Sequence, residues 1–193
     1  MKNHFYAMLS RMKNIYRWGL MRNTKSENLS EHSLETAYIA HALAIIKNNC
    51  FGGNVNPEKV AVAAMFHDTS EIITGDMPTP IKYYNKQIKD VYKEIETAAQ
   101  TTLTDMLPDY IQGDIKAIYE NEDGEIRSLV KAADKISAYI KCVEELNMGN
   151  REFIAAEKTI KKAIKELKMP EADLFMKDFV PSFSLPLDQQ KLD

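Results

Sequence analysis

His67 and Asp68 are adjacent in the sequence, and they follow the apolar stretch VAVAAMF that ends at Phe66. Burying two ionisable side chains is costly unless each finds a partner, and a metal ion is one partner that satisfies both. Neighbouring residues of an α-helix point about 100° apart, because one turn holds ~3.6 residues. Both side chains can therefore reach one ion only where the helix ends. The glycine and prolines downstream favour such an end here.

Two further residues extend this pair to a candidate metal site. His32 lies in the polar run NLSEHSLE, and Asp134 lies within an apolar helical stripe of SLVKAADKISAYIKC. The alternative interpretation of Asp134 is an ion pair with Lys131 or Lys135. Two imidazoles and two carboxylates suit one divalent transition metal ion, such as Mn, Co, Fe, Ni or Zn. On an octahedral ion, four protein ligands leave two positions for water and a substrate oxygen, as in hydrolytic sites.

The elements that must position these residues are helices, because apolar residues recur at helical spacing along most of the chain. Ser30 is the expected N-cap of the helix that carries His32. Asn56 is the expected N-cap of the next helix, which starts at Pro57. This second helix is apolar nearly all round, so it is expected to be buried. The sequence contains no run of alternating strand residues. Further helices are expected near residues 5–15, 88–106, 111–120, 125–146 and 153–167, and from 170 onward.

Two non-helical segments separate these elements. Residues 17–29 are polar and irregular, and the two prolines of DMPTPIK predict an extended loop after the short helical turn TSEIITG. The segment FVPSFSLPLD is expected to be an extended tail that packs and then frays. The chain is therefore expected to be a single all-α domain, a helical bundle over residues 1–193 with a C-terminal tail from about residue 181.

Composition limits the classes of function. The 193 residues are 45% hydrophobic and 27% charged, with a formal net charge of −3. Without a concentrated basic face, a nucleic acid polymer is not expected as a partner. We see neither a signal peptide nor a stretch that approaches the roughly 18 apolar residues of a membrane span. These two observations, together with two cysteines that lie outside any motif, predict a cytoplasmic location.

The order H…HD…D on helices resembles the signature of the HD-domain metal-dependent phosphohydrolases. The resemblance to their bacterial 5′-deoxynucleotidase branch covers nearly the whole chain, roughly residues 2–188. It is carried by six motifs: RWGLMRN at 17–23, SEHSLE at 30–35, GGNVN at 52–56, FHDTSEIITGDMPTPIKY at 66–83, KAADKISAYIKCVEEL at 131–146, and FVPSFSLPLD. It implies an HD-domain fold, a homodimer, and hydrolysis of 2′-deoxyribonucleoside 5′-monophosphates to deoxynucleosides and phosphate, with discrimination against ribonucleotides.

The resemblance also implies roles for particular residues. The implied metal ligands are His32, His67, Asp68 and Asp134. Arg17 matches the arginine that orients the phosphate, and Glu71 matches an acidic residue beside the reacting phosphate. The implied contacts with the nucleoside are Trp18, packed against the sugar, and the loop of Asp76, Met77, Pro78 and Thr79.

Elementary chemistry agrees with these roles. A guanidinium fork suits a phosphate dianion. Glu71 shares a helical face with Asp68, so it is placed for acid or base catalysis, although it could also be a solvated or supporting carboxylate. An indole packed against C2′ of the sugar would leave a 2′-hydroxyl without a hydrogen-bond partner, which would disfavour ribonucleotides. The alternative interpretation of Trp18 is an ordinary core residue.

Other substrates remain open within the same fold. HD enzymes also cleave cyclic dinucleotides, (p)ppGpp or nucleoside triphosphates. The Gly-Tyr-Pro motif typical of the cyclic-dinucleotide branch is absent from this sequence, and a triphosphate would require more cationic groups than Arg17 and a metal provide. A non-catalytic binding protein is a further alternative, but such a protein is expected to lose a ligand or the acid, and all are present.

Overall fold

The structure, a computed structural model, describes residues 3–82, 84–121 and 123–190, and helices are its regular elements. No strand occurs in these ranges, in agreement with the predicted all-α class; one isolated bridge pairs Tyr16 with Asn28. The chain packs as two compact units, each built from separated segments. Unit 1 comprises Met1–Arg22, Ser26–Leu34 and Met65–Glu122, and unit 2 comprises Asn23–Lys25, Glu35–Ala64 and Asp123–Asp193. The single domain over residues 1–193 stays a prediction.

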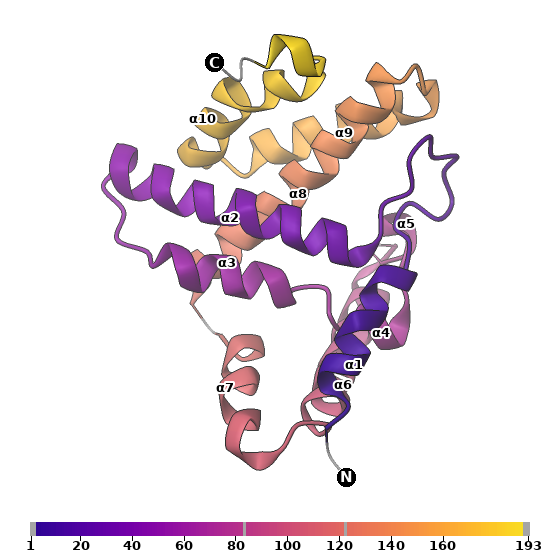
Figure 1. The fold of residues 1–193 in the computed structure, drawn as a ribbon, viewed down its shortest axis with the longest axis vertical. Coiled ribbons are helices and arrows are strands. Elements are labelled where there is room, and N and C mark those ends of the chain that lie inside the picture. The colour runs from indigo at the N-terminus through magenta and orange to yellow at the C-terminus, as the bar shows by residue number, and fades with distance from the viewer. Residues whose placement is uncertain (1–2, 83, 122, 191–193) are drawn as a thin grey trace. The chain divides into compact units, whose positions relative to one another are not determined.

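Unit 1 is built around the long helix α6 (Lys86–Thr104), against which α1 (Phe5–Leu9), α4 (Glu71–Thr74), α5 (Thr79–Lys82) and α7 (Asp109–Tyr119) pack (Figure 1). The first predicted helix is in fact α1 followed by a 3-10 turn, η1 (Ser10–Asn14). The core of unit 1 consists of apolar side chains from the N-terminal helix and from α6 and α7, namely Phe5, Leu103, Leu107 and Ile115.

Unit 2 holds the larger apolar core, formed by α2 (Leu29–Phe51), α3 (Pro57–Phe66), α8 (Gly124–Asn147), α9 (Ile154–Glu166) and α10 (Pro170–Asp178). The start of α2, up to Leu34, and the end of α3, from Met65, belong to unit 1. Figure 1 shows α2 and α3 side by side, and the turn between them is closed by the Asn48 side chain, which bonds both backbone groups of Val55. Beside α10 the chain ends in two 3-10 turns, η3 (Val180–Ser184) and η4 (Leu187–Gln189). None of the helices in the described ranges has the length and apolar content that a bilayer crossing requires.

Four local predictions differ from the structure. The N-cap of α2 is Asn28, whose side chain accepts from the N–H groups of Ser30 and Glu31, while the Glu31 carboxylate accepts from Asn28 N–H. This reciprocal pattern is a capping box, which satisfies more amides than a cap at Ser30 would. On α3 only Val60 and Ala64 are buried, since one face of the helix remains exposed despite its apolar residues.

The other two differences concern the segments predicted to be extended. The end of DMPTPIK forms the helical turn α5, in which the N–H groups of Ile81 and Lys82 donate to Pro78 O; proline fits here because a first helical turn needs no N–H donor from it. The C-terminal segment forms the 3-10 turns η3 and η4, of which η3 contains the buried residue Val180. Residues 191–193 lie outside the described residues. The N-cap at Asn56 and the start of α3 at Pro57 are as predicted.

One buried ionic network anchors a loop within unit 2. The carboxylate of Glu145 on α8 is fully buried and accepts from the ammonium of Lys141, the amide of Asn150 and the backbone N–H groups of Thr24 and Lys25. Although burial acts in the opposite direction, these donors lower the pKa of Glu145 to about 2. The ionised carboxylate therefore holds residues 24 and 25 against α8.

We predict that Glu145→Gln lowers the free energy of unfolding by roughly 3 kcal/mol at pH 7, because it leaves the Lys141 ammonium buried without its counter-ion. The native pKa of Glu145 lies below its ordinary value, so its contribution is complete above pH ~4.5 and is lost as the pH falls toward ~2. Urea unfolding at several pH values measures this. Glu166→Gln, which breaks an exposed ion pair of the same spacing with Lys162, should cost less than about 1 kcal/mol. Equal effects of the two substitutions would contradict the prediction.

Candidate metal centre

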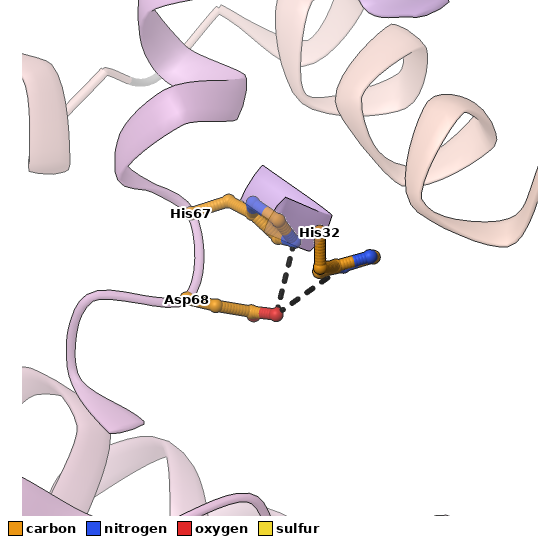
Figure 2. A group of neighbouring side chains, drawn as sticks. All are labelled: His32, His67 and Asp68. Atoms are coloured by element: carbon orange, nitrogen blue, oxygen red, sulfur yellow. Dashed lines mark ion pairs between the residues drawn. The ribbon is translucent and has the colours of Figure 1, made fainter. Parts of the chain in front are cut away.

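Three side chains of unit 1 converge on one point (Figure 2). The Nε2 atoms of His32 and His67 lie 3.6 Å and 3.1 Å from the same oxygen, Oδ2 of Asp68. The ring centroids of the two histidines are 5.3 Å apart, and one ligand atom from each of the three residues lies within 4.8 Å of the others. His32 is fully buried, whereas His67 and Asp68 are partly exposed. The exposure of the cluster therefore comes from His67 and Asp68.

The backbone explains the convergence. Helix α3 ends at Phe66, and α4 begins at Glu71, so His67 and Asp68 lie in the turn between two helices rather than on a regular helix. The turn is closed by the Glu71 N–H, which donates to Asp68 O at 3.0 Å. His32 lies in the first turn of α2, where its N–H donates to Asn28 O. Both histidines thus lie near a helix terminus.

Glu27, a buried carboxylate that no sequence motif marks, contacts three of the predicted site residues. Its Oε1 lies 3.3 Å from Nδ1 of His32 and 3.4 Å from Nε of Arg17, and its Oε2 accepts from the indole Nε1–H of Trp18 at 3.0 Å. Burial raises the pKa of Glu27, but the bond to His32 and the charge of Arg17 outweigh it and lower the pKa. A carboxylate on the far nitrogen of a histidine fixes the ring orientation, as in many metal sites.

Arg17 and Trp18 lie in the segment between η1 and α2. The Arg17 guanidinium donates to Asp68 Oδ2 at 3.3 Å, and its backbone N–H donates to Glu27 O at 2.9 Å. Trp18 has a φ of 59°, in the left-handed region that bulky residues rarely adopt. Strain of this kind persists only where surrounding contacts impose it, and it is concentrated at functional sites. Here the bond from the indole to Glu27 is one such contact.

The charges around Asp68 decide its ionisation. Burial raises the pKa of Asp68, but His67, His32 and Arg17 together hold it below its usual range. The residue is therefore a carboxylate that faces two imidazoles. Two imidazoles and one ionised carboxylate form a donor set that suits zinc and other borderline divalent ions, so the residues present fit such an ion.

Glu71 lies in a contrasting environment. The side chain is only 4% exposed, and its Oε2 atom has no hydrogen-bond partner among the described residues. Burial and the negative charges of Asp68 and Asp76 raise the pKa of Glu71 to about 9. At neutral pH the group is therefore protonated in the absence of a metal ion. A protonated carboxyl beside an ionised one is the arrangement that separates acid from base roles in hydrolases.

The predicted nucleoside loop connects α4 to α5. Gly75 follows α4 with a φ of 73°, a conformation that glycine adopts without strain, and so redirects the chain. Asp76, Met77 and Pro78 are each partly buried, and burial raises the pKa of Asp76. The side chain of Thr79 lies outside the described part of the structure.

The remaining predicted ligand belongs to the other unit. Asp134 is a half-buried residue of α8, in unit 2. His32, His67 and Asp68 are all in unit 1, so the ligand role of Asp134 stays a prediction. Unit 2 also contains a cavity of about 520 Å³, whose lining includes Lys47, Lys131 and Glu171 but none of the predicted site residues.

Solved structures of low sequence identity share the fold. An HD-domain phosphohydrolase from Listeria innocua is 22% identical, with a TM-score of 0.81 over 93% of this chain and 88% of that chain. The cyanophage S-2L HD phosphohydrolase DatZ, solved bound to dA and one catalytic Zn²⁺ ion, is 20% identical, with a TM-score of 0.66 over 92% of this chain and 95% of that chain. The fold is therefore that of the HD-domain phosphohydrolases, as the resemblance predicted.

Sequence relatives narrow the assignment. The 5′-deoxynucleotidases of Yersinia pestis (strain Pestoides F) and Yersinia pseudotuberculosis (serotype O:3, strain YPIII) are each 53% identical over 193 residues, which cover 99% of this chain and 98% of theirs. The model of the YfbR-like 5′-deoxynucleotidases matches residues 4–183. The chain belongs to the YfbR-like 5′-deoxynucleotidase family.

We predict that Glu27→Gln weakens metal binding ten- to a hundredfold, because an amide holds the His32 ring less firmly than a carboxylate does. Titration calorimetry with Zn²⁺ or Mn²⁺ on metal-stripped protein measures the Kd. Glu31→Gln removes the same charge from an exposed position four residues away and should leave the Kd unchanged. An unaltered Kd in Glu27→Gln would show that the contact with His32 has no part in metal binding.

Proposed function

We propose that this protein is a metal-dependent phosphomonoesterase that hydrolyses 2′-deoxyribonucleoside 5′-monophosphates to deoxynucleosides and phosphate. Membership of the family and full-length relatives named 5′-deoxynucleotidase support this activity. The observation that carries it is the convergence of His32, His67 and Arg17 on Asp68 Oδ2, since these are the groups that a metal ion and a phosphate would each require. The same relatives favour a monophosphate over cyclic dinucleotides, (p)ppGpp or nucleoside triphosphates.

His32, His67, Asp68 and Asp134 would hold one divalent transition metal ion, with Co, Mn, Zn, Fe and Ni as candidates. The cluster of the first three residues and the Zn²⁺ of the cyanophage protein support a divalent ion. Such an ion, when bound, polarises a phosphoryl oxygen and lowers the pKa of a water molecule toward neutrality. The remaining steps depend on the chain's own residues.

Arg17 would bind the phosphate. Its guanidinium is held beside Asp68 by Glu27, so its fork is oriented before a substrate arrives. A planar fork matches two phosphate oxygens and disperses the negative charge that increases during attack by water. Glu71, protonated in the metal-free site, can donate a proton to the leaving 5′-oxygen and then recover one from water. This assigns Arg17, Asp68 and Glu71 to the chemistry.

Trp18 and the loop of Asp76, Met77, Pro78 and Thr79 would bind the deoxynucleoside. The indole is oriented by its bond to Glu27, and the Trp18 backbone N–H bonds the Asp76 carboxylate. The Asp76 carboxylate can accept a bond from the 3′-hydroxyl. A rigid indole against C2′ would give a 2′-hydroxyl neither space nor a partner, and discrimination against ribonucleotides would follow. We also propose a cytoplasmic location and a homodimer, the latter testable by light scattering after gel filtration.

We predict that metal-loaded protein hydrolyses dAMP with a kcat/KM roughly 100-fold above that for AMP, because the 2′-hydroxyl loses its hydrogen bonds to water without compensation. A phosphate-release assay over paired deoxy- and ribonucleotides measures the ratio. Trp18→Ala should reduce the ratio severalfold. Tyr16→Ala, an exposed aromatic residue two positions earlier, serves as the control. Equal turnover of the two nucleotides by the parent protein would refute the proposed role of Trp18.

Asp134→Ala tests the fourth ligand. We expect activity to fall by about a thousandfold or more at every metal concentration that restores the metal-stripped parent, since the loss of one ligand changes both affinity and geometry. Lys131→Ala, one turn earlier on the exposed side of α8, is the matched control. Circular dichroism confirms that the variants fold. Retention of full activity would remove Asp134 from the ligand set.

A further inference from the structure

Lys82 is a half-buried cation at the end of the predicted nucleoside loop. It is the last residue of α5, a helix of four residues. Its Nζ atom lies 2.9 Å from Oε1 of Glu96 on α6 and 4.7 Å from the centroid of the Tyr92 ring, one turn earlier on the same helix. Burial opposes the charge on Lys82, but the bond to Glu96 and its charge outweigh burial and raise the pKa of Lys82. The ammonium therefore stays charged, and it joins α5 to α6.

The same ammonium also faces the candidate site. Its Nζ atom lies 3.9 Å from Oε1 of Glu71, whose closest charged neighbours otherwise include the carboxylates of Asp68 and Asp76. A positive charge at this distance interacts favourably with the dipole of the protonated Glu71 carboxyl, as it would with the ionised group, and so limits the rotation of the side chain. Lys82 thus contacts α6 on one side and a proposed catalytic group on the other.

A helix of one turn cannot maintain itself in water, because nucleation fixes several residues for very few hydrogen bonds. Helix α5 has backbone bonds from the N–H groups of Ile81 and Lys82 to Pro78 O, but Ile81 itself is exposed. The conformation of the adjoining loop therefore depends on contacts between α5 and α6, and the ion pair between Lys82 and Glu96 is the one at its C-terminal end.

We propose that Lys82 is a positioning residue that holds the nucleoside loop, residues 76–79, in its binding conformation by clamping α5 to Glu96 on α6, and that its ammonium keeps the Glu71 side chain in place. This inference rests on the proposed deoxynucleotidase activity, because it assigns the loop to substrate binding. The Lys82 side chain thus has two separate effects. The pair with Glu96 acts on affinity, whereas the contact with Glu71 acts on turnover.

The two effects predict different kinetics for two variants. Glu96→Gln weakens the clamp but leaves the ammonium beside Glu71, so the KM for dAMP should rise about tenfold with kcat changed less than about twofold. Lys82→Met keeps an unbranched stem over Tyr92 but removes the charge, so it should raise KM by the same factor and also lower kcat. Lys82→Arg should recover most of both losses, and Lys89→Met, on the exposed side of α6, is the control.

The double variant Lys82→Met with Glu96→Gln tests whether the two residues act as a pair. Its KM should equal that of Lys82→Met, because the ion pair is already absent once one of its two partners has been replaced. Multiplied effects of the two substitutions would overturn the clamp. Unchanged KM in both single variants would overturn it as well.

Amide hydrogen exchange gives a readout that does not depend on turnover. Peptides covering residues 76–82 should exchange faster in Lys82→Met and Glu96→Gln than in the parent, while peptides from α8 and α9 remain unchanged. A raised KM without faster exchange would overturn the clamp, since it would mean direct contact of Lys82 with the substrate. If the parent hydrolyses no deoxynucleotide, the proposed function fails, but the exchange experiment still decides whether Lys82 holds the loop.

Discussion

The buried carboxylate of Glu27 is the interaction on which the candidate site depends. The segment between η1 and α2 has no helical hydrogen bonds of its own over most of its length, yet it holds the guanidinium of Arg17 and the indole of Trp18 in defined positions. Glu27 contacts Arg17, Trp18 and His32 at once. One carboxylate thus couples the orientation of a candidate metal ligand to that of two candidate substrate contacts. Any change that displaces Glu27 would disturb all three.

A second physical contrast lies within one turn of chain. Asp68 and Glu71 are both carboxylic acids, and burial disfavours the charge on each. Asp68 faces two imidazoles and a guanidinium, which keep its pKa low, whereas Glu71 faces other carboxylates, and its pKa rises to about 9. Neighbouring groups, rather than residue type, therefore make one acid an ionised candidate ligand and the other a protonated candidate proton donor.

Much of the fold followed from the sequence, because helical periodicity and capping residues act locally. The end of α3 before His67 and the cap at Asn56 both followed from residue type. The predictions failed where tertiary contacts, rather than local sequence, determine the structure. Glu27 is one polar residue among many in an irregular segment, and only the fold brings it to His32. The helical turn of α5 was missed because prolines suggest extension more often than a first helical turn.

The candidate site itself was partly predictable. The adjacency of His67 and Asp68 at a helix end is a local property of the sequence. Their convergence with His32 was predicted from the family pattern, and the structure confirms it. The ion pair between Lys82 and Glu96 joins two different helices, and no spacing pattern in the sequence predicts it. Electrostatic partners of this kind are fixed by packing, so they become visible only in three dimensions.

The discontinuous make-up of unit 1 constrains the order of events during synthesis. Its core joins Phe5 to Leu103 and Ile115, so the core around the first helix stays incomplete until more than half of the chain has been translated. His32, His67 and Asp68 leave the ribosome well before that point. The nascent chain therefore exposes the candidate metal ligands before unit 1 is complete, and a divalent ion that bound them early would have to be exchanged or retained as α6 and α7 close the unit.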